Sequence, residues 1–267
     1  MALLLALANC AIALISMYLF VYGPWQLPPV ISEYGRAYDR QFMLTLVITG
    51  IIFFFAQLGL SYMVFHFRDR SGRRASYVHG NSKTALAGTA VLAVFFLGID
   101  LILDLSGEHI WTELHLQSAP SGALQIEVTG QQFTWYVRYP GSDGKFGRTK
   151  PELMKESIGQ PLGIDPDDPA GNDDLVMPIM AVPVNRPVEV ILRSKDVIHS
   201  FFIPELRIKQ DAMPGLESRI HFTASQLGRY EIPCTELCGL GHHQMRSFLD
   251  VKTDADYQQW LVDSAIE

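Results

Sequence analysis

The chain has 267 residues, of which 48% are hydrophobic and 18% are charged, and its formal net charge is −7 at pH 7. A nucleic-acid-binding protein would carry a basic stripe, so this acidic balance argues against nucleic acid as a partner. It suits a basic protein partner, because opposite potentials steer encounter. High hydrophobicity combined with charged segments predicts a membrane part joined to a soluble part. The cysteine count is three, an odd number that implies no disulfide framework.

The first apolar run covers residues 1–22, long enough to cross a bilayer, which takes about 20 residues. A cleaved signal peptide is the alternative interpretation, but no Lys or Arg precedes Arg36 and the run has no small-x-small cleavage site. We therefore expect residues 1–22 to form an extra transmembrane helix, or an uncleaved signal-like segment. Residues 23–41 contain three prolines, which forbid a continuous helix, and are expected to form a polar periplasmic connector.

Two further apolar runs predict transmembrane helices over residues 42–67 and 84–105. The segment between them, residues 68–83, contains four arginines and a lysine. Short basic loops of this kind stay in the cytoplasm. The charge pattern therefore predicts a multi-pass membrane protein whose basic hairpin is inside and whose residues beyond about 106 are outside.

In the soluble part the hydrophobic period changes to two. Apolar and polar residues alternate over 124–128 and again over 188–192, which is typical of half-buried strands. Many short strands separated by Gly, Pro and Ser predict a β-sandwich or barrel. Further strands are expected at 219–223, 229–233 and 247–252, and a short C-terminal helix at 254–267.

An acidic stretch rich in Gly and Pro interrupts the strand pattern between Pro140 and Pro183. Oxygen-rich, turn-forming sequence is what Ca²⁺ requires, so a calcium loop is one interpretation. The stretch lacks the spacing of an EF-hand, which favours a solvated acidic loop instead. A third interpretation is a docking surface for a basic partner.

The most informative stretch lies near the C-terminus and contains Cys234, Cys238, His242 and Met245, at spacings of four, four and three residues. Soft sulfur ligands favour copper, and imidazole suits copper as well. Structural zinc loops usually lack a methionine ligand, so the thioether argues against zinc. A second histidine, His199, lies 35 residues before Cys234, at the end of a strand-like run.

With this histidine, the sequence resembles subunit II of the haem–copper respiratory oxidases, the cytochrome c oxidase family, over roughly residues 40–255. The binuclear copper motif of that family reads Cys-x-Glu-x-Cys-x3-His-x2-Met, with a histidine about 35 residues before it. The stretch 206–215 also resembles the family sequence that follows this histidine. All six motif positions are matched here, by His199, Cys234, Glu236, Cys238, His242 and Met245.

The resemblance implies a fold of N-terminal transmembrane α-helices plus an all-β, cupredoxin-like Greek-key sandwich. The sandwich would be a periplasmic copper A domain over residues 118–253, attached to the bacterial inner (cell) membrane. The implied cofactor is binuclear copper A, two copper ions bridged by Cys234 and Cys238. His199 and His242 would each cap one ion, and Met245 would be a weak axial ligand.

Two further roles are implied around this centre. Glu236 would offer its backbone carbonyl to copper and its carboxylate to a magnesium ion shared with subunit I. Asp196 and Asp211 would orient the ligand-bearing loops by hydrogen bonds, as outer-shell carboxylates commonly do.

The implied function is that of an electron-accepting subunit of cytochrome-c oxidase, an oxidoreductase and proton translocase, with no complete active site in this chain alone. Electrons would come from cytochrome c or another c-type donor and pass to the haem of subunit I, where oxygen is reduced to water with proton pumping. Subunit I and other oxidase subunits would be the partners. The copper A subunit of a membrane nitric oxide reductase is the alternative, since subunit I decides the substrate.

The chain departs from the family pattern at two functional places. The family stretch Gly-x-Gln-Trp-x-Trp, whose first tryptophan receives electrons, reads here with Phe133 at that position and Trp135 at the second. We expect electrons to enter at Phe133, with Trp135 as the neighbouring aromatic. Residues 82–86 lack the glutamate that in the family often lies at the mouth of a proton channel.

Overall fold

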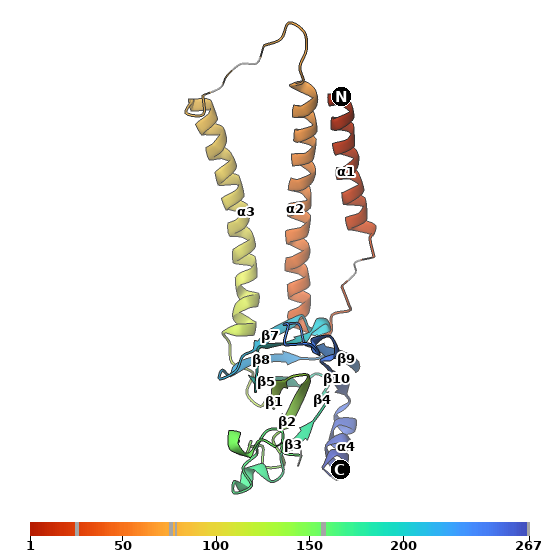
Figure 1. Cartoon of the computed structure of the whole chain (residues 1–267), viewed down its shortest axis with the longest axis vertical. Coiled ribbons are helices and arrows are strands. Elements are labelled where there is room, and N and C mark those ends of the chain that lie inside the picture. Colours follow the sequence, from red (N-terminus) through yellow and green to blue (C-terminus); the bar gives the residue numbers. More distant parts are fainter. Residues whose placement is uncertain (25–26, 75–76, 78, 156–158, 266–267) are drawn as a thin grey trace. The chain divides into compact units, whose positions relative to one another are not determined.

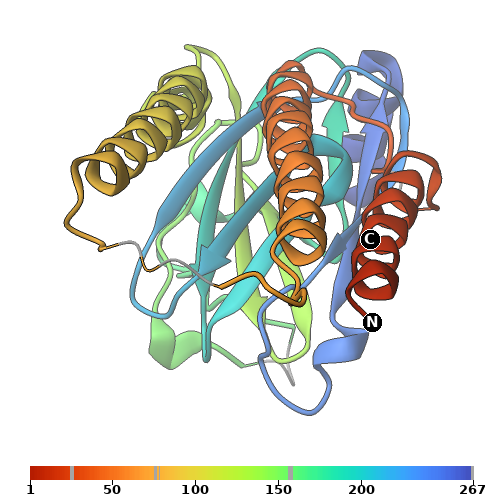
Figure 2. The same cartoon turned by 90° about the horizontal axis from the view of Figure 1, so that it is seen from above.

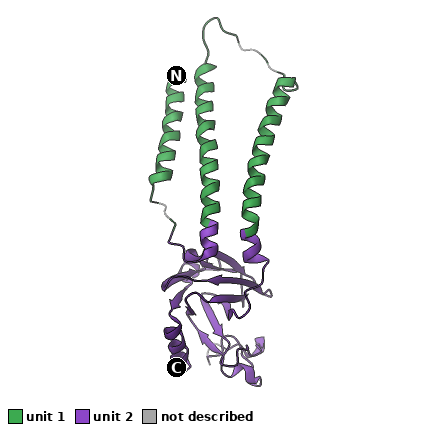
Figure 3. Ribbon diagram, turned by 180° about the vertical axis from the view of Figure 1, so that it is seen from behind, with its two compact units in different colours: residues 1–27, 39–109 green, residues 28–38, 110–267 purple. Residues whose placement is uncertain are grey.

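The computed structural model describes residues 1–24, 27–74, 77, 79–155 and 159–265. The chain divides into two compact units, one of residues 1–27 and 39–109 and the other of residues 28–38 and 110–267 (Figure 3). The predicted connector, basic hairpin and C-terminal helix each include residues outside the described part, namely 25–26, 75–76 with 78, and 266–267.

The first unit is built from long helices: α1 (Ala2–Tyr22), most of α2 (Glu33–His66) and most of α3 (Lys83–His115). Helix α2 lies between α1 and α3 (Figures 1 and 2). All three helices are long and apolar enough to cross a membrane. The predicted class of N-terminal membrane helices joined to a β domain is confirmed.

Two of these helices extend beyond the expected spans. Helix α2 begins at Glu33, so residues 33–41 of the expected connector are helical. Ser32 explains this start, because its hydroxyl accepts a hydrogen bond from the Gly35 backbone N–H (2.9 Å) and caps the first turn. Helix α3 continues to His115, ten residues past 105. Hydropathy identifies only the apolar part of a helix that crosses the membrane. Helices α2 and α3 both continue into polar sequence beyond that part.

Helix α1 packs on α2 through small residues and one polar contact. Ala6 and Ala13 are buried, and between them the Asn9 side-chain amide donates to the Gln57 carbonyl (3.0 Å) and to the Ser61 hydroxyl (2.9 Å). Small residues let membrane helices approach closely, and an amide in hydrocarbon requires a partner. Asn9 therefore has a specific place on α2.

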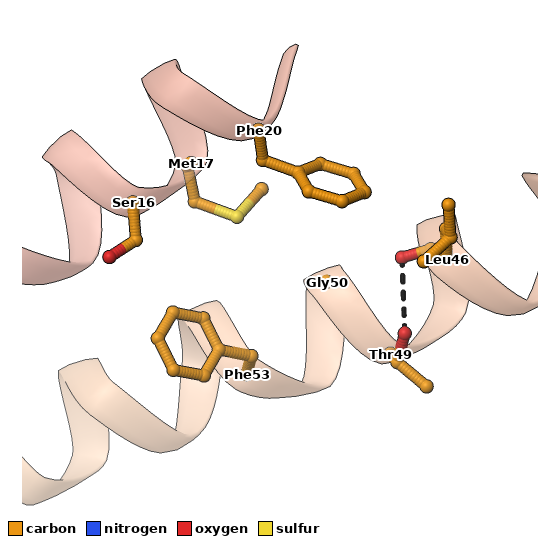
Figure 4. Close-up of a pocket in the computed structure, with 7 residues that line it drawn as sticks. All are labelled: Ser16, Met17, Phe20, Leu46, Thr49, Gly50 and Phe53. Carbon is orange, nitrogen blue, oxygen red and sulfur yellow. Dashed lines mark hydrogen bonds between the residues drawn. The ribbon is translucent and has the colours of Figure 1, made fainter. Parts of the chain in front are cut away.

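Beyond this contact the two helices separate around a cavity of about 270 Å³ (Figure 4). Met17 and Phe20 of α1 face Phe53 of α2 across it (Figure 4). The Thr49 hydroxyl at its edge donates to the Leu46 carbonyl (3.2 Å) within α2.

We expect Asn9→Leu to loosen α1 from α2 by about 1 kcal/mol, the usual scale of a hydrogen bond between membrane helices. Cross-linking of Met17→Cys with Gly50→Cys in membranes, in a Cys10→Ala background, would measure this contact. Ala11→Leu, on the exposed face of α1, is the matched control. A mature subunit whose intact mass lacks residues 1–22, or equal cross-linking in Asn9→Leu, would contradict the expectation.

The second unit contains three sheets and a C-terminal helix, α4 (Asp254–Ser264). A five-stranded sheet has the order β3-β2-β1-β5-β8, a three-stranded sheet the order β4-β10-β9, and β6 pairs with β7. The strands are β1 (Leu124–Gln131), β2 (Thr134–Tyr139), β3 (Leu175–Met177), β4 (Met180–Pro183), β5 (Pro187–Ser194), β6 (His199–Ile203), β7 (Ile208–Ala212), β8 (Ser218–Thr223), β9 (Gly228–Pro233) and β10 (Arg246–Lys252).

The hydrophobic core lies between the five-stranded and three-stranded sheets. Ile126 and Val190, from the paired parallel strands β1 and β5, are fully buried, as are Met180 and Leu249 from the parallel pair β4 and β10. Side chains from the inner faces of both sheets thus fill one core, which is the packing of a β-sandwich.

The core also includes residues before the expected start of the domain at 118. Ile31, only 1% exposed, and Leu114 belong to the core cluster. The Ile31 backbone N–H donates to the Glu205 carbonyl (2.9 Å), and its carbonyl accepts from the Ser225 N–H (2.7 Å). The second compact unit therefore includes residues 28–38, which were expected to belong to the connector, and residues 110–117, which lie between the expected end of the third helix at 105 and the expected start of the domain at 118.

The acidic insertion is joined to the sandwich through Arg138 of β2, which is 1% exposed. Its guanidinium contacts Asp174 of the insertion, the Gly147 carbonyl, and Glu127 of β1 (2.8 Å). Lys150 and Asp165 form a second ion pair (2.8 Å) within the insertion. A buried charge is tolerated where it is paired and hydrogen-bonded. Several carboxylates of the acidic insertion thus form ion pairs inside the domain.

Candidate metal centre

Three segments meet at one end of the sandwich. His199 is the first residue of β6, where a neighbouring loop was expected. Cys234 directly follows β9, and Phe201 of β6 bridges to it. Met245 directly precedes β10. The chain between Cys234 and Met245 therefore forms a closed loop whose two ends are fixed by paired strands.

The side chains that the motif predicts as ligands converge in this loop. The Cys234 Sγ lies 3.9 Å from the Cys238 Sγ and 3.9 Å from the His199 Nδ1. The Cys238 Sγ in turn lies 3.6 Å from the His242 Nδ1 and 3.7 Å from the Met245 Sδ. His199, Cys234 and Cys238 are also the group with metal-holding geometry found among the described residues.

These spacings fit a metal site. Two ligand atoms about 2.2 Å from one ion at a tetrahedral angle lie about 3.6 Å apart, close to the separations seen here. The donors are two thiols, two imidazoles and a thioether, a soft set that suits copper. His199, Cys234, Cys238 and Met245 are all at most 6% exposed, so their donor atoms are held away from water.

Asp196 fixes the orientation of the His199 ring. Its Oδ1 lies 2.8 Å from the His199 Nε2, and its Oδ2 accepts from the Gln132 backbone N–H (2.8 Å). Burial raises the pKa of the Asp196 carboxyl, but the hydrogen bonds from Gln132 and His199 lower it by more. An ionised Asp196 holds the proton on Nε2, so the lone pair of Nδ1 faces the thiols and is available to bind a metal ion. This is the outer role predicted for Asp196.

Asp211 was predicted to act in the same way, but it contacts Ser200, the residue that follows His199, and not a candidate ligand itself. Its Oδ1 accepts from the Ser200 hydroxyl (2.6 Å) and from the Lys209 ammonium (2.9 Å). The Ser200 carbonyl accepts from the Thr235 backbone N–H (3.0 Å), at the start of the cysteine loop. Asp211 thus supports β6 and the loop through Ser200.

The backbone carbonyl and the side chain of Glu236 lie in different environments. Its backbone carbonyl lies 3.2 Å from the Cys234 Sγ and so points into the site. The residue as a whole is exposed, which leaves its carboxylate in the solvent of this isolated chain. This arrangement suits the two roles that the family resemblance implies for Glu236.

The two aromatic residues of the β1–β2 turn occupy different environments. Trp135 is 1% exposed and meets the His199 ring edge-on, with ring centroids 5.8 Å apart. It is therefore an interior residue behind the histidine. Phe133 is 38% exposed and covers the cysteine loop, where a Cβ on Gly241 would lie 2.4 Å from its ring. Of the two, Phe133 presents the aromatic surface.

The contribution of the neighbouring Gly130 and Gln132 was not predicted from the sequence. A Cβ on Gly130 would lie 2.9 Å from the His199 ring and 3.0 Å from Trp135, so the glycine makes room for both. The Gln132 side-chain amide donates to the Cys238 carbonyl. The only signal in the sequence was their position within the Gly-x-Gln pattern.

The two cysteines have different acidities in the metal-free chain. Burial raises the pKa of the Cys234 thiol, but His199 and the backbone groups of Ser200 and Glu236 more than offset it and lower the pKa to about 6. Burial and the adjacent Cys234 thiolate raise the pKa of Cys238 to about 11. At pH 7 the site therefore holds one thiolate and one thiol.

Titration of the metal-free full-length chain should resolve this difference. With Cys10→Ala, thiolate absorbance should rise in two steps, near pH 6 and near pH 11, and Cys234→Ser should remove the lower step. Because protons compete with metal for a thiolate, copper affinity should fall as the pH falls below about 11, where Cys238 becomes protonated, and should fall more steeply below about 6, where Cys234 becomes protonated as well. A single step for both thiols near pH 9 would contradict the assignment.

Comparison with known proteins places the chain in a family. Residues 170–251 match the family described as cytochrome C oxidase subunit II, periplasmic domain. The alternative cytochrome c oxidase subunit 2 of Bradyrhizobium diazoefficiens is 34% identical over 261 residues, covering 96% of this chain and 90% of the relative. Cytochrome c oxidase subunit 2 of Cereibacter sphaeroides is 29% identical over 229 residues, covering 81% and 72%.

Among solved structures, the periplasmic domain of subunit II of cytochrome oxidase from Bradyrhizobium japonicum is 31% identical, with a TM-score of 0.41. The match covers 55% of this chain and 96% of the Bradyrhizobium japonicum domain. The identity and coverage of the Bradyrhizobium diazoefficiens relative, together with the matched copper motif, show that the chain belongs to the cytochrome c oxidase subunit II family.

Proposed function

We propose that this chain is the electron-accepting subunit of a terminal respiratory oxidase and holds a binuclear copper A centre. The observation that carries the proposal is the convergence of two thiols, two imidazole nitrogens and a thioether, with successive separations of 3.6–3.9 Å. The relatives are named as subunits of cytochrome c oxidase, which supports the oxidase over the nitric oxide reductase.

Each side chain has a role in this proposal. Cys234 and Cys238 would hold the two copper ions through their thiolates, and His199 and His242 would each bind one ion. Met245 and the Glu236 carbonyl would complete the set as weaker ligands. When bound there, the copper pair supplies a one-electron centre that shares its charge over two ions.

The surrounding protein keeps the ligands in place between redox states. The loop ends are fixed by the bond from the Cys234 N–H to the Met245 carbonyl (3.0 Å) and by that from Thr235 to Ser200. Rigid ligands keep geometric change small during electron transfer. The fold thus favours rapid acceptance and release of an electron.

The same proposal assigns partners and topology. A c-type cytochrome or equivalent would be the electron donor, and the haem of subunit I, where oxygen is reduced to water with proton pumping, would be the acceptor. The exposed Glu236 carboxylate would hold a magnesium ion together with subunit I. The basic segment 68–83 lies in the cytoplasm and the copper domain in the periplasm of a bacterial inner membrane, as the positive-inside rule indicates.

Metal analysis of the full-length chain in its complex tests the copper site. We expect two coppers per chain and a spectroscopic signal from an electron shared by both. Cys234→Ser or Cys238→Ser should abolish that signal. Met245→Leu should keep the copper and shift its reduction potential, since an axial thioether is a weak ligand that tunes potential. One tightly bound zinc, or a single isolated copper, would contradict the binuclear site.

We further propose that the donor docks over Phe133. Its ring is partly exposed and lies directly on the loop between Cys238 and His242. Loss of an aromatic contact of about 1.4 kcal/mol weakens docking about tenfold. Phe133→Ala should therefore slow electron transfer from the physiological donor by about this factor, in stopped-flow measurements at low donor concentration, and Phe133→Trp should restore it. The copper spectrum should stay unchanged, and unaltered donor kinetics would place docking elsewhere.

A further inference from the structure

The turn between β1 and β2, residues 130–135, contacts both arms of the candidate copper site. On one side, Gly130 and Trp135 pack against the His199 ring. On the other, Phe133 packs against the loop glycines that follow Cys238. One short turn thus touches segments that carry opposite ligands of the site.

Gln132 joins these two arms by hydrogen bonds. Its backbone N–H donates to Asp196 (2.8 Å), and the other oxygen of Asp196 holds the His199 Nε2 at 2.8 Å. Its side-chain amide donates to the Cys238 carbonyl. The two linked residues lie 64 and 106 positions further along the chain. A single residue therefore connects the histidine arm with the cysteine arm.

The side-chain half of this link depends on a specific glycine. A Cβ on Gly239 would lie 2.6 Å from the Gln132 Nε2, so any side chain at position 239 would displace the amide. Gly239 also has φ of +140°, a conformation that residues with a Cβ rarely adopt. The loop backbone is thus shaped to receive the Gln132 amide at the Cys238 carbonyl.

We propose that Gln132 is a positioning residue of the copper site, which couples the Cys238 arm to the Asp196–His199 arm. The inference rests on the proposed copper site and adds a residue that is not a ligand. Partners beyond the direct ligands commonly change metal affinity by about 10–100-fold. The amide also directs the positive end of an N–H dipole toward the site, which disfavours the more positive, oxidised state.

The position allows a clean test, because Gln132 is exposed and its truncation opens no core cavity. Gln132→Ala removes the donor, and Gln132→Glu keeps the shape while replacing the donor with an acceptor-only carboxylate. Gln125→Ala is the matched control, an exposed glutamine of β1 whose amide donates to Glu189 (2.9 Å). All variants are made in the full-length subunit within its complex.

The measurements are copper content, reduction potential, the electron paramagnetic resonance spectrum and the rate of copper loss to a chelator. We expect both Gln132 variants to lose copper about tenfold faster. Both should have a lower reduction potential, with the larger shift in Gln132→Glu because its negative charge favours the oxidised site. Gln125→Ala should match the wild type.

The outcomes separate this inference from the proposed function. A wild-type chain without two coppers would contradict the proposed function itself. A copper-loaded wild type with potential, spectrum and chelator release unchanged in both Gln132 variants would overturn the positioning role alone. A potential shift equal in Gln125→Ala and the Gln132 variants would also overturn it, since the effect would then not depend on the bond to Cys238.

Discussion

Two buried thiols 3.9 Å apart constrain everything around them. Both can ionise together only if positive charge lies between or beside them, because like charges at this distance oppose each other strongly. In the metal-free chain this repulsion between thiolates accompanies a lowered pKa for Cys234 and a raised pKa for Cys238. A bound metal ion with a preference for sulfur would remove this repulsion, which is why the thiol pair supports the proposed copper site. The loop and the strands are arranged to keep the thiols this close.

The sandwich provides the rigidity that the loop alone lacks. Cys234 and Met245 lie at the ends of β9 and β10, which pair in antiparallel register, so the loop is closed by a ladder of backbone hydrogen bonds. His199 comes from β6, whose partner β7 carries Asp211. Ligands on strand ends are held more precisely than ligands on free loops. The parallel pairing of β1 with β5 brings the turn at 130–135 to the same end.

The convergence of the candidate ligands and the position of several strands could be predicted from the sequence because those features are local. The motif spans twelve residues, and strands β1, β5, β8, β9 and β10 overlap the expected runs. Strand β6 was not recognised as a strand beginning at His199, since His199, Ser200 and Phe201 are all buried and show no alternation. Contacts such as that of Gln132 with Cys238 join residues 106 positions apart, and no periodicity reports them. Helix ends were also missed, because hydropathy does not detect a cap such as Ser32.

The acidic composition of the chain suggested a surface that attracts a basic partner, but several of the acidic side chains of the insertion form ion pairs within the domain. Acidic residues of the insertion contact internal partners, as Asp174 does with Arg138 and Asp165 with Lys150. Around the cysteine loop, by contrast, Leu237 and Leu240 are 78% and 98% exposed, beside the partly exposed Phe133. Exposed apolar residues that gather beside a candidate electron-transfer site are typical of an interaction surface. The proposed docking of a donor therefore has exposed apolar residues close to the candidate ligands to use, while Arg138 and Asp174 join the insertion to the sandwich and Lys150 and Asp165 pair within the insertion.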